Sequence, residues 1–251
     1  MFEQIRDKRV LITGAGSGIG GAIARLFAER GAVIGVHYHS SKDSAQKILD
    51  EVHGLGCKAE LFQANLLRAA ESERLGRSFI KQFGGIDVLV NNAGGLSEYQ
   101  HFSSLSEDSF DQTYALNVKA PFFLGRIALE SMKRNEWGRI INISSTAIKY
   151  SGASSLHYVS SKAAMESVSK GFANDGAKYN VLVNLIRCGV IDTSMHQKID
   201  GYSEEAFQRR VSLIPVGQSG SPKDIAQMAL FLASECGDFI TGETFTVAGG
   251  D

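Results

Sequence analysis

Tyr158 and Lys162 lie four residues apart in "SSLHYVSSKAAM", a stretch rich in serine and alanine. On a helix, residues i and i+4 share a face, so the phenol and the ammonium would lie side by side. A nearby positive charge favours the phenolate, so we expect the pKa of Tyr158 to fall from its usual value of about 10. Such a pair can donate and accept a proton. The alternative is that both groups are solvated on an exposed helix face.

The composition favours a globular protein with a sizeable core. The chain has 251 residues, of which 43% are apolar and 21% are charged, as is usual for a folded domain. It carries 26 Lys and Arg against 27 Asp and Glu, so we expect neither a nucleic acid nor a membrane as partner. The N-terminus shows no signal-peptide pattern, and no apolar run is long enough to span a bilayer, which together predict a cytoplasmic protein.

Cysteine usage agrees with this location. Cys57, Cys188 and Cys236 are odd in number and too widely spaced for a metal-binding knuckle. The sequence therefore predicts a reducing compartment and no metal site.

Short apolar runs alternate with longer helical patterns along the whole chain. We expect strands at 9–13, 33–38, 58–63, 86–91, 139–144, 181–186 and 244–249, and helices at 18–30, 42–55, 68–83, 107–133 and 157–179. Ser106 and the pair Ser221-Pro222 mark helix starts. Several strand runs are apolar almost throughout, as in parallel strands buried on both faces. The pattern predicts a single α/β domain over residues 1–251, with a seven-stranded parallel sheet, doubly wound, flanked by helices on both faces.

A glycine-rich stretch, "TGAGSGIGGAI", joins the first predicted strand to the first predicted helix. Glycine allows a tight turn and lets the backbone approach a pyrophosphate. The N-terminus of the following helix offers free N–H groups and the positive end of a dipole. Any tight strand-to-helix turn can need glycine, but this position, with the spacing G-x-x-x-G-x-G from Gly14, indicates a dinucleotide site.

Five motifs occur in the order and spacing of the short-chain dehydrogenase/reductase family, which the chain resembles over essentially its whole length. They are "TGAGSGIG" (13–20), "NNAG" (91–94), Asn117 in "ALNVKAPFF", "NISS" (142–145) and "YVSSK" (158–162). The resemblance, which extends to 3-oxoacyl-carrier-protein reductases, implies a Rossmann-type fold and an NAD(P)-dependent dehydrogenase or reductase. Its substrate would be a small carbonyl compound or alcohol, held by residues 95–105, 146–157 and a substrate loop at about 192–216.

The resemblance assigns catalysis to Asn117, Ser145, Tyr158 and Lys162. Ser145 would hydrogen-bond the substrate oxygen, and Tyr158 would exchange a proton with it as hydride moves to or from the nicotinamide. Lys162 would keep Tyr158 acidic and bind the nicotinamide ribose, while Asn117 would bend its helix and order a proton-relaying water. His157 points about 100° away from Tyr158 on the helix and is interpreted as a neighbour only.

The resemblance also implies a set of residues that bind the cofactor. They are Gly14, Ser17, Gly18, Ile19, Tyr38, His39, Ser40, Asn65, Leu66, Asn92, Ala93, Gly94, Tyr158, Lys162, Gly189, Val190, Ile191 and Thr193. Asn65 stands where the family usually has an aspartate beside the adenine amino group, and its amide oxygen can still accept that hydrogen bond. Cys188 replaces the family's proline before Gly189, and we interpret it as a packing residue.

The end of the second predicted strand, "VHYHSSK", indicates which cofactor is preferred. NAD-preferring relatives usually place a carboxylate there for the adenosine 2′-hydroxyl, and this chain has Tyr38 instead. Ser40 and Ser41 could donate hydrogen bonds to a 2′-phosphate, although one of them could instead cap the helix that begins near Lys42. We therefore predict a preference for NADP(H), with NAD(H) as the alternative.

Two functions of different classes remain open. One is an NADP(H)-dependent carbonyl reductase or alcohol dehydrogenase with Tyr158 as general acid and base. The other is a catalytically silent nucleotide-sensing protein of the same fold, which the complete set of four catalytic residues disfavours. Among enzymes, a 3-oxoacyl-carrier-protein reductase is the alternative. Glu136 and Tyr179 occupy the places where those enzymes carry carrier-docking arginines, although Arg134 lies close by.

The predicted helix 157–179 also suggests self-association. It carries the small residues Ala163, Ala164, Ser167, Gly171 and Ala173, which would let two helices approach closely or pack within one chain. The family resemblance implies a homotetramer.

Overall fold

Parallel strands form one twisted sheet in the computed structural model, which describes residues 2–96, 98–193 and 203–251. Over these residues the sheet has seven strands in the order β3-β2-β1-β4-β5-β6-β7, which confirms the predicted fold class. The strands are β1 (Arg9–Ile12), β2 (Val33–Tyr38), β3 (Ala59–Gln63), β4 (Val88–Asn91), β5 (Gly138–Ser145), β6 (Val181–Cys188) and β7 (Thr244–Val247).

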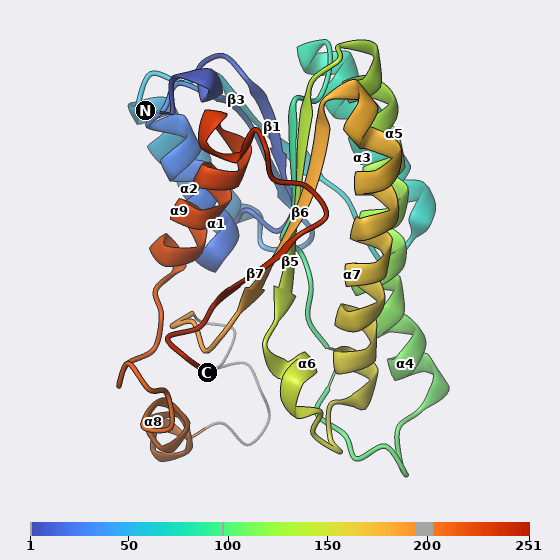
Figure 1. Cartoon of the computed structure of the whole chain (residues 1–251), viewed down its shortest axis with the longest axis vertical. Coiled ribbons are helices and arrows are strands. Elements are labelled where there is room, and N and C mark those ends of the chain that lie inside the picture. The colour runs from blue at the N-terminus through green and yellow to red at the C-terminus, as the bar shows by residue number, and fades with distance from the viewer. Residues whose placement is uncertain (1, 97, 194–202) are drawn as a thin grey trace.

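Helices cover both faces of the sheet (Figure 1). On one face lie α1 (Gly18–Ala28), α2 (Lys42–Gly54) and α9 (Pro222–Ala233); on the other lie α3 (Ala69–Phe83), α4 (Glu107–Tyr114), α5 (Ala120–Arg134) and α7 (Leu156–Gly176). Each layer has its own apolar core against the sheet, around Ile23 and Ile225 on the first face and Phe79 and Leu124 on the second. The long central strands are buried on both faces, which explains their almost continuous apolar runs.

The helix starts expected from the sequence are present. The Ser106 hydroxyl accepts the Ser109 N–H at 3.1 Å, and the Ser221 N–H donates to Asp224 at 2.7 Å at the start of α9. The segment predicted as one helix over 107–133 is divided by a π-helical turn, Ala115–Lys119, between α4 and α5. The predicted helix 157–179 ends at Gly176 and continues as a 3₁₀ turn, Ala177–Tyr179.

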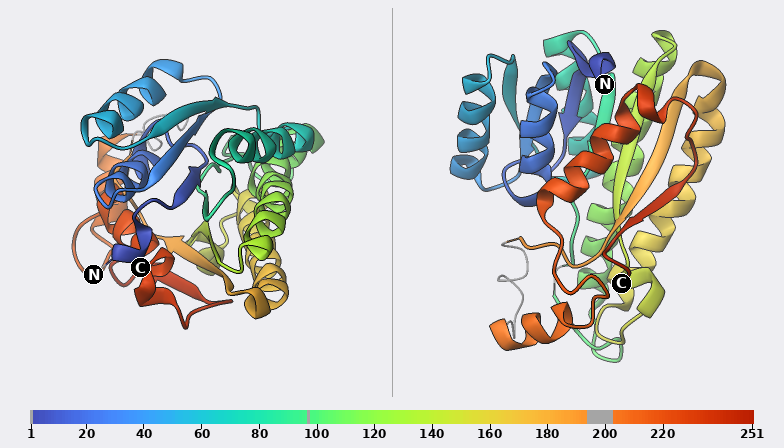
Figure 2. Two further views of the ribbon diagram at one scale, coloured as in Figure 1. Left: turned by 90° about the horizontal axis from the view of Figure 1, so that it is seen from above. Right: turned by 60° about the vertical axis from the view of Figure 1, so that its left-hand side comes forward.

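The strand order reverses between β1 and β4, and ligands of open α/β sheets bind outside the carboxyl ends of the strands at such a point. Two short helices lie at this end of the sheet: α6 (Ala147–Tyr150) directly after β5, and α8 (Glu204–Val211) farther out (Figures 1 and 2). No helix in the described ranges is long and apolar enough to cross a bilayer. Within the same ranges, no three His, Cys, Asp or Glu side chains gather as metal ligands.

Candidate active site

Four side chains predicted to carry the chemistry meet beside the carboxyl end of β5. Ser145 is the last residue of that strand, Tyr158 and Lys162 lie on α7, and Asn117 lies in the π-helical turn. The Ser145 hydroxyl lies close enough to the Tyr158 phenol to influence its pKa. A Cβ built on Gly94 would lie 2.8 Å from Lys162 Nζ and 2.9 Å from Asn117 Oδ1, so these two groups converge on the same glycine.

The Ser145 hydroxyl is oriented by the chain that follows it. Its oxygen accepts the backbone N–H of Ala147 at 3.1 Å, in the first turn of α6. A hydroxyl that accepts one hydrogen bond still has its own proton to donate. Ser145 can therefore act as a donor toward an oxygen placed beside Tyr158.

Lys162 is buried, with 6% of its surface exposed. Its ammonium donates to the carbonyl oxygen of Ile143 at 2.9 Å, which anchors α7 to β5. Burial lowers the pKa of Lys162 from 10.5 to about 8, against the opposing influence of the neighbouring Cys188. The lysine is thus a poorly solvated cation beside the reacting groups.

The pKa of Tyr158 differs from the expectation based on its spacing to Lys162. Burial raises it to about 12, while the nearby Ser145 hydroxyl acts in the opposite direction. The two residues do share a helix face, but the ammonium lies 5.7 Å from the centre of the phenol ring and is turned to Ile143. Desolvation of the phenolate therefore dominates, and the expected lowering of the pKa is wrong for this arrangement. Tyr158 is a protonated phenol at neutral pH.

Asn117 ties the π-helical turn to the loop after β4. Its amide nitrogen donates to the Gly95 carbonyl at 2.7 Å and to the Ser161 hydroxyl at 2.9 Å, and its oxygen accepts the Gly95 N–H at 2.9 Å. Single π turns are often found at functional sites. The irregular helix expected at Asn117 is this turn, and it holds the Gly94–Gly95 backbone against α7.

The glycine-rich loop is packed against the "NNAG" loop. Gly14 and Gly18 have φ of +64° and +52°, a conformation that favours glycine. The Thr13 hydroxyl accepts the N–H groups of Asn92 and Ala93 at 3.0 Å each, and the Asn92 amide donates to the Thr13 carbonyl at 2.9 Å. The two loops thus form one cradle whose backbone can approach a pyrophosphate closely.

A cavity of about 320 Å³ adjoins this cradle. Its lining includes several residues predicted to bind cofactor: Gly14, His39, Asn65, Leu66, Ala93 and Gly94. The other residues predicted to bind cofactor are not part of this lining. Ser17 precedes α1 and Ile19 lies in its first turn; Tyr38 ends β2, with Ser40 just beyond it. The cradle and cavity fit the adenosine and phosphate portion of a dinucleotide.

The segment after β6 closes the other side of the cradle. Gly189 donates its N–H to Val247 at 3.0 Å, and Ile191 forms an isolated parallel bridge with Gly220. The Thr193 methyl group lies 3.5 Å from a Cβ built on Gly18, which brings this segment to the glycine-rich loop. Val190 is held in the same turn, where its carbonyl accepts the Gly220 N–H at 2.9 Å.

His37 is a site residue that the sequence reasoning missed. It is 2% exposed and also lines the cavity. Its Nδ1 accepts the Gly14 N–H at 3.0 Å, and its Nε2 donates to the Ala64 carbonyl at 3.2 Å, so the ring joins the glycine-rich loop to the end of β3. Burial lowers the pKa of His37 from 6.5 to about 4. A histidine inside the apolar run "VIGVHY" was the available signal.

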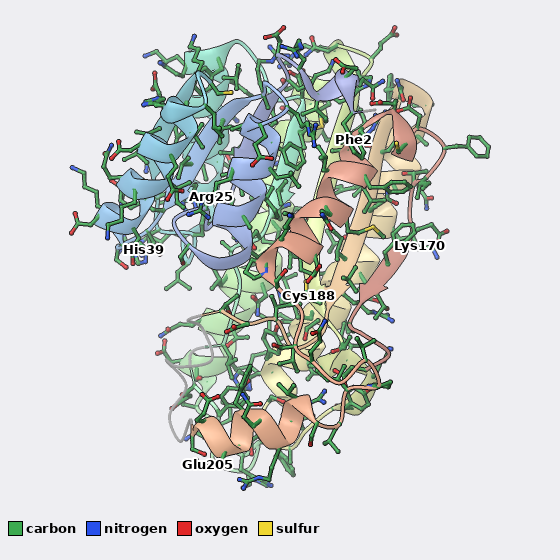
Figure 3. All side chains as sticks on the ribbon, turned by 90° about the vertical axis from the view of Figure 1, so that its left-hand side faces the viewer. Phe2, Arg25, His39, Lys170, Cys188 and Glu205 are labelled. Atoms are coloured by element: carbon green, nitrogen blue, oxygen red, sulfur yellow. The ribbon has the colours of Figure 1, made fainter. Side chains whose placement is uncertain are left out.

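The predicted substrate loops meet beside Tyr158. The N–H groups of Gln100 and Phe102 donate to the carbonyls of Ser154 and Ala153 at 3.1 Å each, which joins residues 98–105 to the segment before α7. Of the loop predicted over 192–216, the structure describes 192–193 and 203–216, where α8 is the expected short helix. Residues 97 and 194–202 lie outside the described residues. Figure 3 shows α8, marked by Glu205, beyond the end of β6, marked by Cys188.

Comparisons with known proteins find relatives over almost the whole chain. The family model described as enoyl-(acyl carrier protein) reductase matches residues 14–251. A 3-oxoacyl-carrier-protein reductase from Thermotoga maritima is 32% identical over 98% of each chain.

Two solved structures resemble the whole chain. A blue fluorescent protein from a metagenomic library, in complex with NADPH, aligns with a TM-score of 0.90 and 32% identity over 98% of each chain. A 7α-hydroxysteroid dehydrogenase, complexed with NADH and 7-oxo glycochenodeoxycholic acid, aligns with a TM-score of 0.92 and 34% identity, covering 99% of this chain and 96% of its own.

Replacing Gly94 with alanine should weaken dinucleotide binding by about tenfold or more, because the new Cβ would displace Lys162 and Asn117. Gly95→Ala is the matched control, since a Cβ there meets nothing within 4 Å. Dissociation constants of both variants can be measured by quenching of protein fluorescence with NADPH. Equal affinities for the two variants would contradict the close approach at Gly94.

His37 should make the protein less stable in acid. Between pH about 6.5 and about 4 the unfolded chain binds a proton that folded His37 does not, so the free energy of unfolding should fall by about 3 kcal/mol as the pH is lowered. The free energy of unfolding can be measured with urea at several pH values across this range. Its slope against pH should be shallower for His37→Asn. The exposed His101→Asn should keep the wild-type slope. A wild-type slope in His37→Asn would show that His37 is not held neutral.

Proposed function

Since the chain belongs to the short-chain dehydrogenase/reductase family and is therefore an oxidoreductase, we propose that it interconverts a small ketone or aldehyde and the corresponding alcohol with NADP(H). The observation that carries the proposal is that Ser145, Tyr158 and the buried ammonium of Lys162 come together at the end of β5. This arrangement places a proton donor, a second hydroxyl donor and a positive charge at the edge of the dinucleotide cradle.

The nicotinamide, when bound, supplies or accepts the hydride. In the reduction direction, Tyr158 donates its phenolic proton to the carbonyl oxygen, and Ser145 donates a hydrogen bond to the same oxygen. Lys162 stabilises the phenolate that this transfer leaves behind. Asn117 holds Gly95 and Ser161, and so keeps the loop after β4 and helix α7 in register around the reacting groups.

The nucleotide-sensing alternative is disfavoured by the complete catalytic set. A sensor needs the cradle but has no need of a serine hydroxyl beside the Tyr158 phenol or of a desolvated lysine near them. Steady consumption of NADPH with a carbonyl compound would exclude a purely sensing role.

Substrates carried by an acyl carrier protein are also disfavoured, because Glu136 is exposed and would repel an acidic carrier. Positive charge is present at the other position, Tyr179. The ammonium groups of Lys133 and Lys178 lie 5.1 and 5.0 Å from the centre of its ring. A panel of ketones, sugars and acyl thioesters, assayed with both nicotinamide cofactors, separates these substrate classes.

The preference for NADP(H) is supported by the exposed residues after β2. His39, Ser40, Ser41 and Lys42 are exposed, and His39 lies at the surface in Figure 3. Ser41 occupies the N-cap position of α2, but its side chain makes no capping hydrogen bond in the described structure. The serine hydroxyls, the positive lysine and the N-terminus of α2 thus suit a 2′-phosphate.

Self-association is supported by an exposed small-residue face on α7. Ala163, Ser167 and Gly171 are exposed there, and a Cβ on Gly171 would meet nothing within 4 Å, whereas Ala173 is buried within the chain. Phe122 on α5 lies close to this face, 39% exposed and stacked on Phe172 at 5.6 Å. We propose that two copies pack through this face, within a homotetramer.

Tyr158→Phe should abolish carbonyl reduction while NADPH still binds, because the change removes the proton but little of the shape. We expect kcat to fall by about 10³-fold or more and the NADPH dissociation constant to change less than about threefold. Stopped-flow absorbance at the NADPH band gives the first quantity and fluorescence titration the second. A variant that retains most of its kcat would show that another group supplies the proton.

The cofactor preference should be about tenfold or more in kcat/KM for NADPH over NADH with one substrate. Tyr38→Asp should reverse this preference, because its carboxylate would accept the ribose 2′-hydroxyl and repel a 2′-phosphate. A wild-type preference for NADH would overturn the cofactor proposal.

Light scattering at micromolar concentration should give a mass near four times the 27.1 kDa of one chain. Ser167→Arg should lower this mass, because the long charged side chain blocks close approach of two α7 helices. Ser44→Arg, an equivalent change on exposed α2, should leave it unchanged. A monomeric wild-type protein would contradict the proposal.

A further inference from the structure

Helix α8 carries an arginine that ties it to the end of the chain by an ion pair. Val211 is the only buried side chain among the described residues of this helix. One turn of apolar packing is a weak anchor for an element at the edge of a binding site. Arg210, next to Val211, reaches toward the end of the chain, where its guanidinium group meets the side chain of Asp251.

Asp251 is the centre of a polar cluster that joins three segments. Its side chain is 6% exposed, and Arg210 Nη2 bonds both carboxylate oxygens at 2.5 Å. The Thr146 hydroxyl donates to the same carboxylate at 3.5 Å, and the Lys149 ammonium donates to the Asp251 carbonyl at 3.0 Å. A buried carboxylate needs such partners, so α8 and α6 are both held to Asp251.

The α6 side of the cluster is continuous with catalytic Ser145. Thr146 directly follows Ser145, and its N–H donates to the Cys188 carbonyl at 2.9 Å. The next residue, Ala147, provides the N–H that orients the Ser145 hydroxyl. The contacts of Asp251 thus lie one residue from the group that faces the substrate.

The segment after α8 is fixed in the same region. The Val216 N–H donates to the Gly249 carbonyl at 3.1 Å. Gly249 and Gly250 have φ of +64° and +95°, which lets the backbone turn closely against Ile214 and Pro215. The segment that follows α8 therefore packs directly against residues 249–251.

We propose that Arg210 and Asp251 are positioning residues that fix α8 against the first turn of α6 and so hold the substrate-side wall of the site in register with Ser145. This inference rests on the proposed carbonyl reduction for its kinetic consequence. The glycine-rich loop and the "NNAG" loop follow β1 and β4, away from the cluster, so we expect the main effect on the carbonyl substrate.

The kinetic test compares two neighbouring arginines on α8. Arg210→Ala should raise the KM of the carbonyl substrate about tenfold while kcat falls less than about threefold and the NADPH dissociation constant is unchanged. Arg209→Ala, an exposed position on the same helix, should leave all three values unchanged. Asp251→Asn should reproduce the effect, and the double variant should be no worse than Arg210→Ala alone. Equal KM values for the two arginine variants, or additive effects in the double variant, would overturn the proposal.

Hydrogen–deuterium exchange separates failure of this inference from failure of the proposed function. In the absence of substrate, Arg210→Ala should speed exchange of amides in both 204–211 and 146–150, whereas Arg209→Ala should not. Faster exchange in both segments supports the link even if no carbonyl compound is turned over. Unchanged exchange in 146–150 overturns the link, and faster exchange with an unchanged KM overturns the positioning role.

Discussion

The buried ammonium of Lys162 is the constraint around which the site is arranged. A charged group that is 6% exposed is costly unless polar atoms replace water around it. The Ile143 carbonyl accepts a hydrogen bond from the ammonium. Gly94 leaves room for the ammonium, which a side chain at that position would displace. No salt bridge with a carboxylate is found for Lys162 in the described part of the chain, and its ammonium lies 5.7 Å from the Tyr158 ring centre.

The sheet and the π-helical turn position the groups that surround Lys162. β5 extends to Ser145 and β6 to Cys188, paired in register, so that the strand ends, and not flexible loops, carry the reacting hydroxyl. The extra residue of the π turn directs Asn117 to Gly95 and Ser161 at once. The geometry of the proposed site is thus set by regular elements of the fold.

The sequence predicts much of this architecture because the decisive signals are local. Strand runs such as 181–186 are apolar almost throughout, and the motif around Tyr158 and Lys162 lies within about one helix turn. The pKa of Tyr158 was predicted in the wrong direction because spacing along a helix contains no information about burial. His37 and the Arg210–Asp251 pair were missed because their partners lie 23 to 41 residues away, and only the folded chain brings them together.

The pKa of Lys162 tests the central claim most directly, because it reports both the burial of the ammonium and its charge state beside Tyr158. The ¹³Cε resonance of labelled lysine, assigned by its loss in Lys162→Met, can be followed as the pH is raised. We expect Lys162 to lose its proton near pH 8, well below the usual lysine value of 10.5. A midpoint near 10.5 would contradict the account, since it would describe a solvated lysine that cannot organise the site.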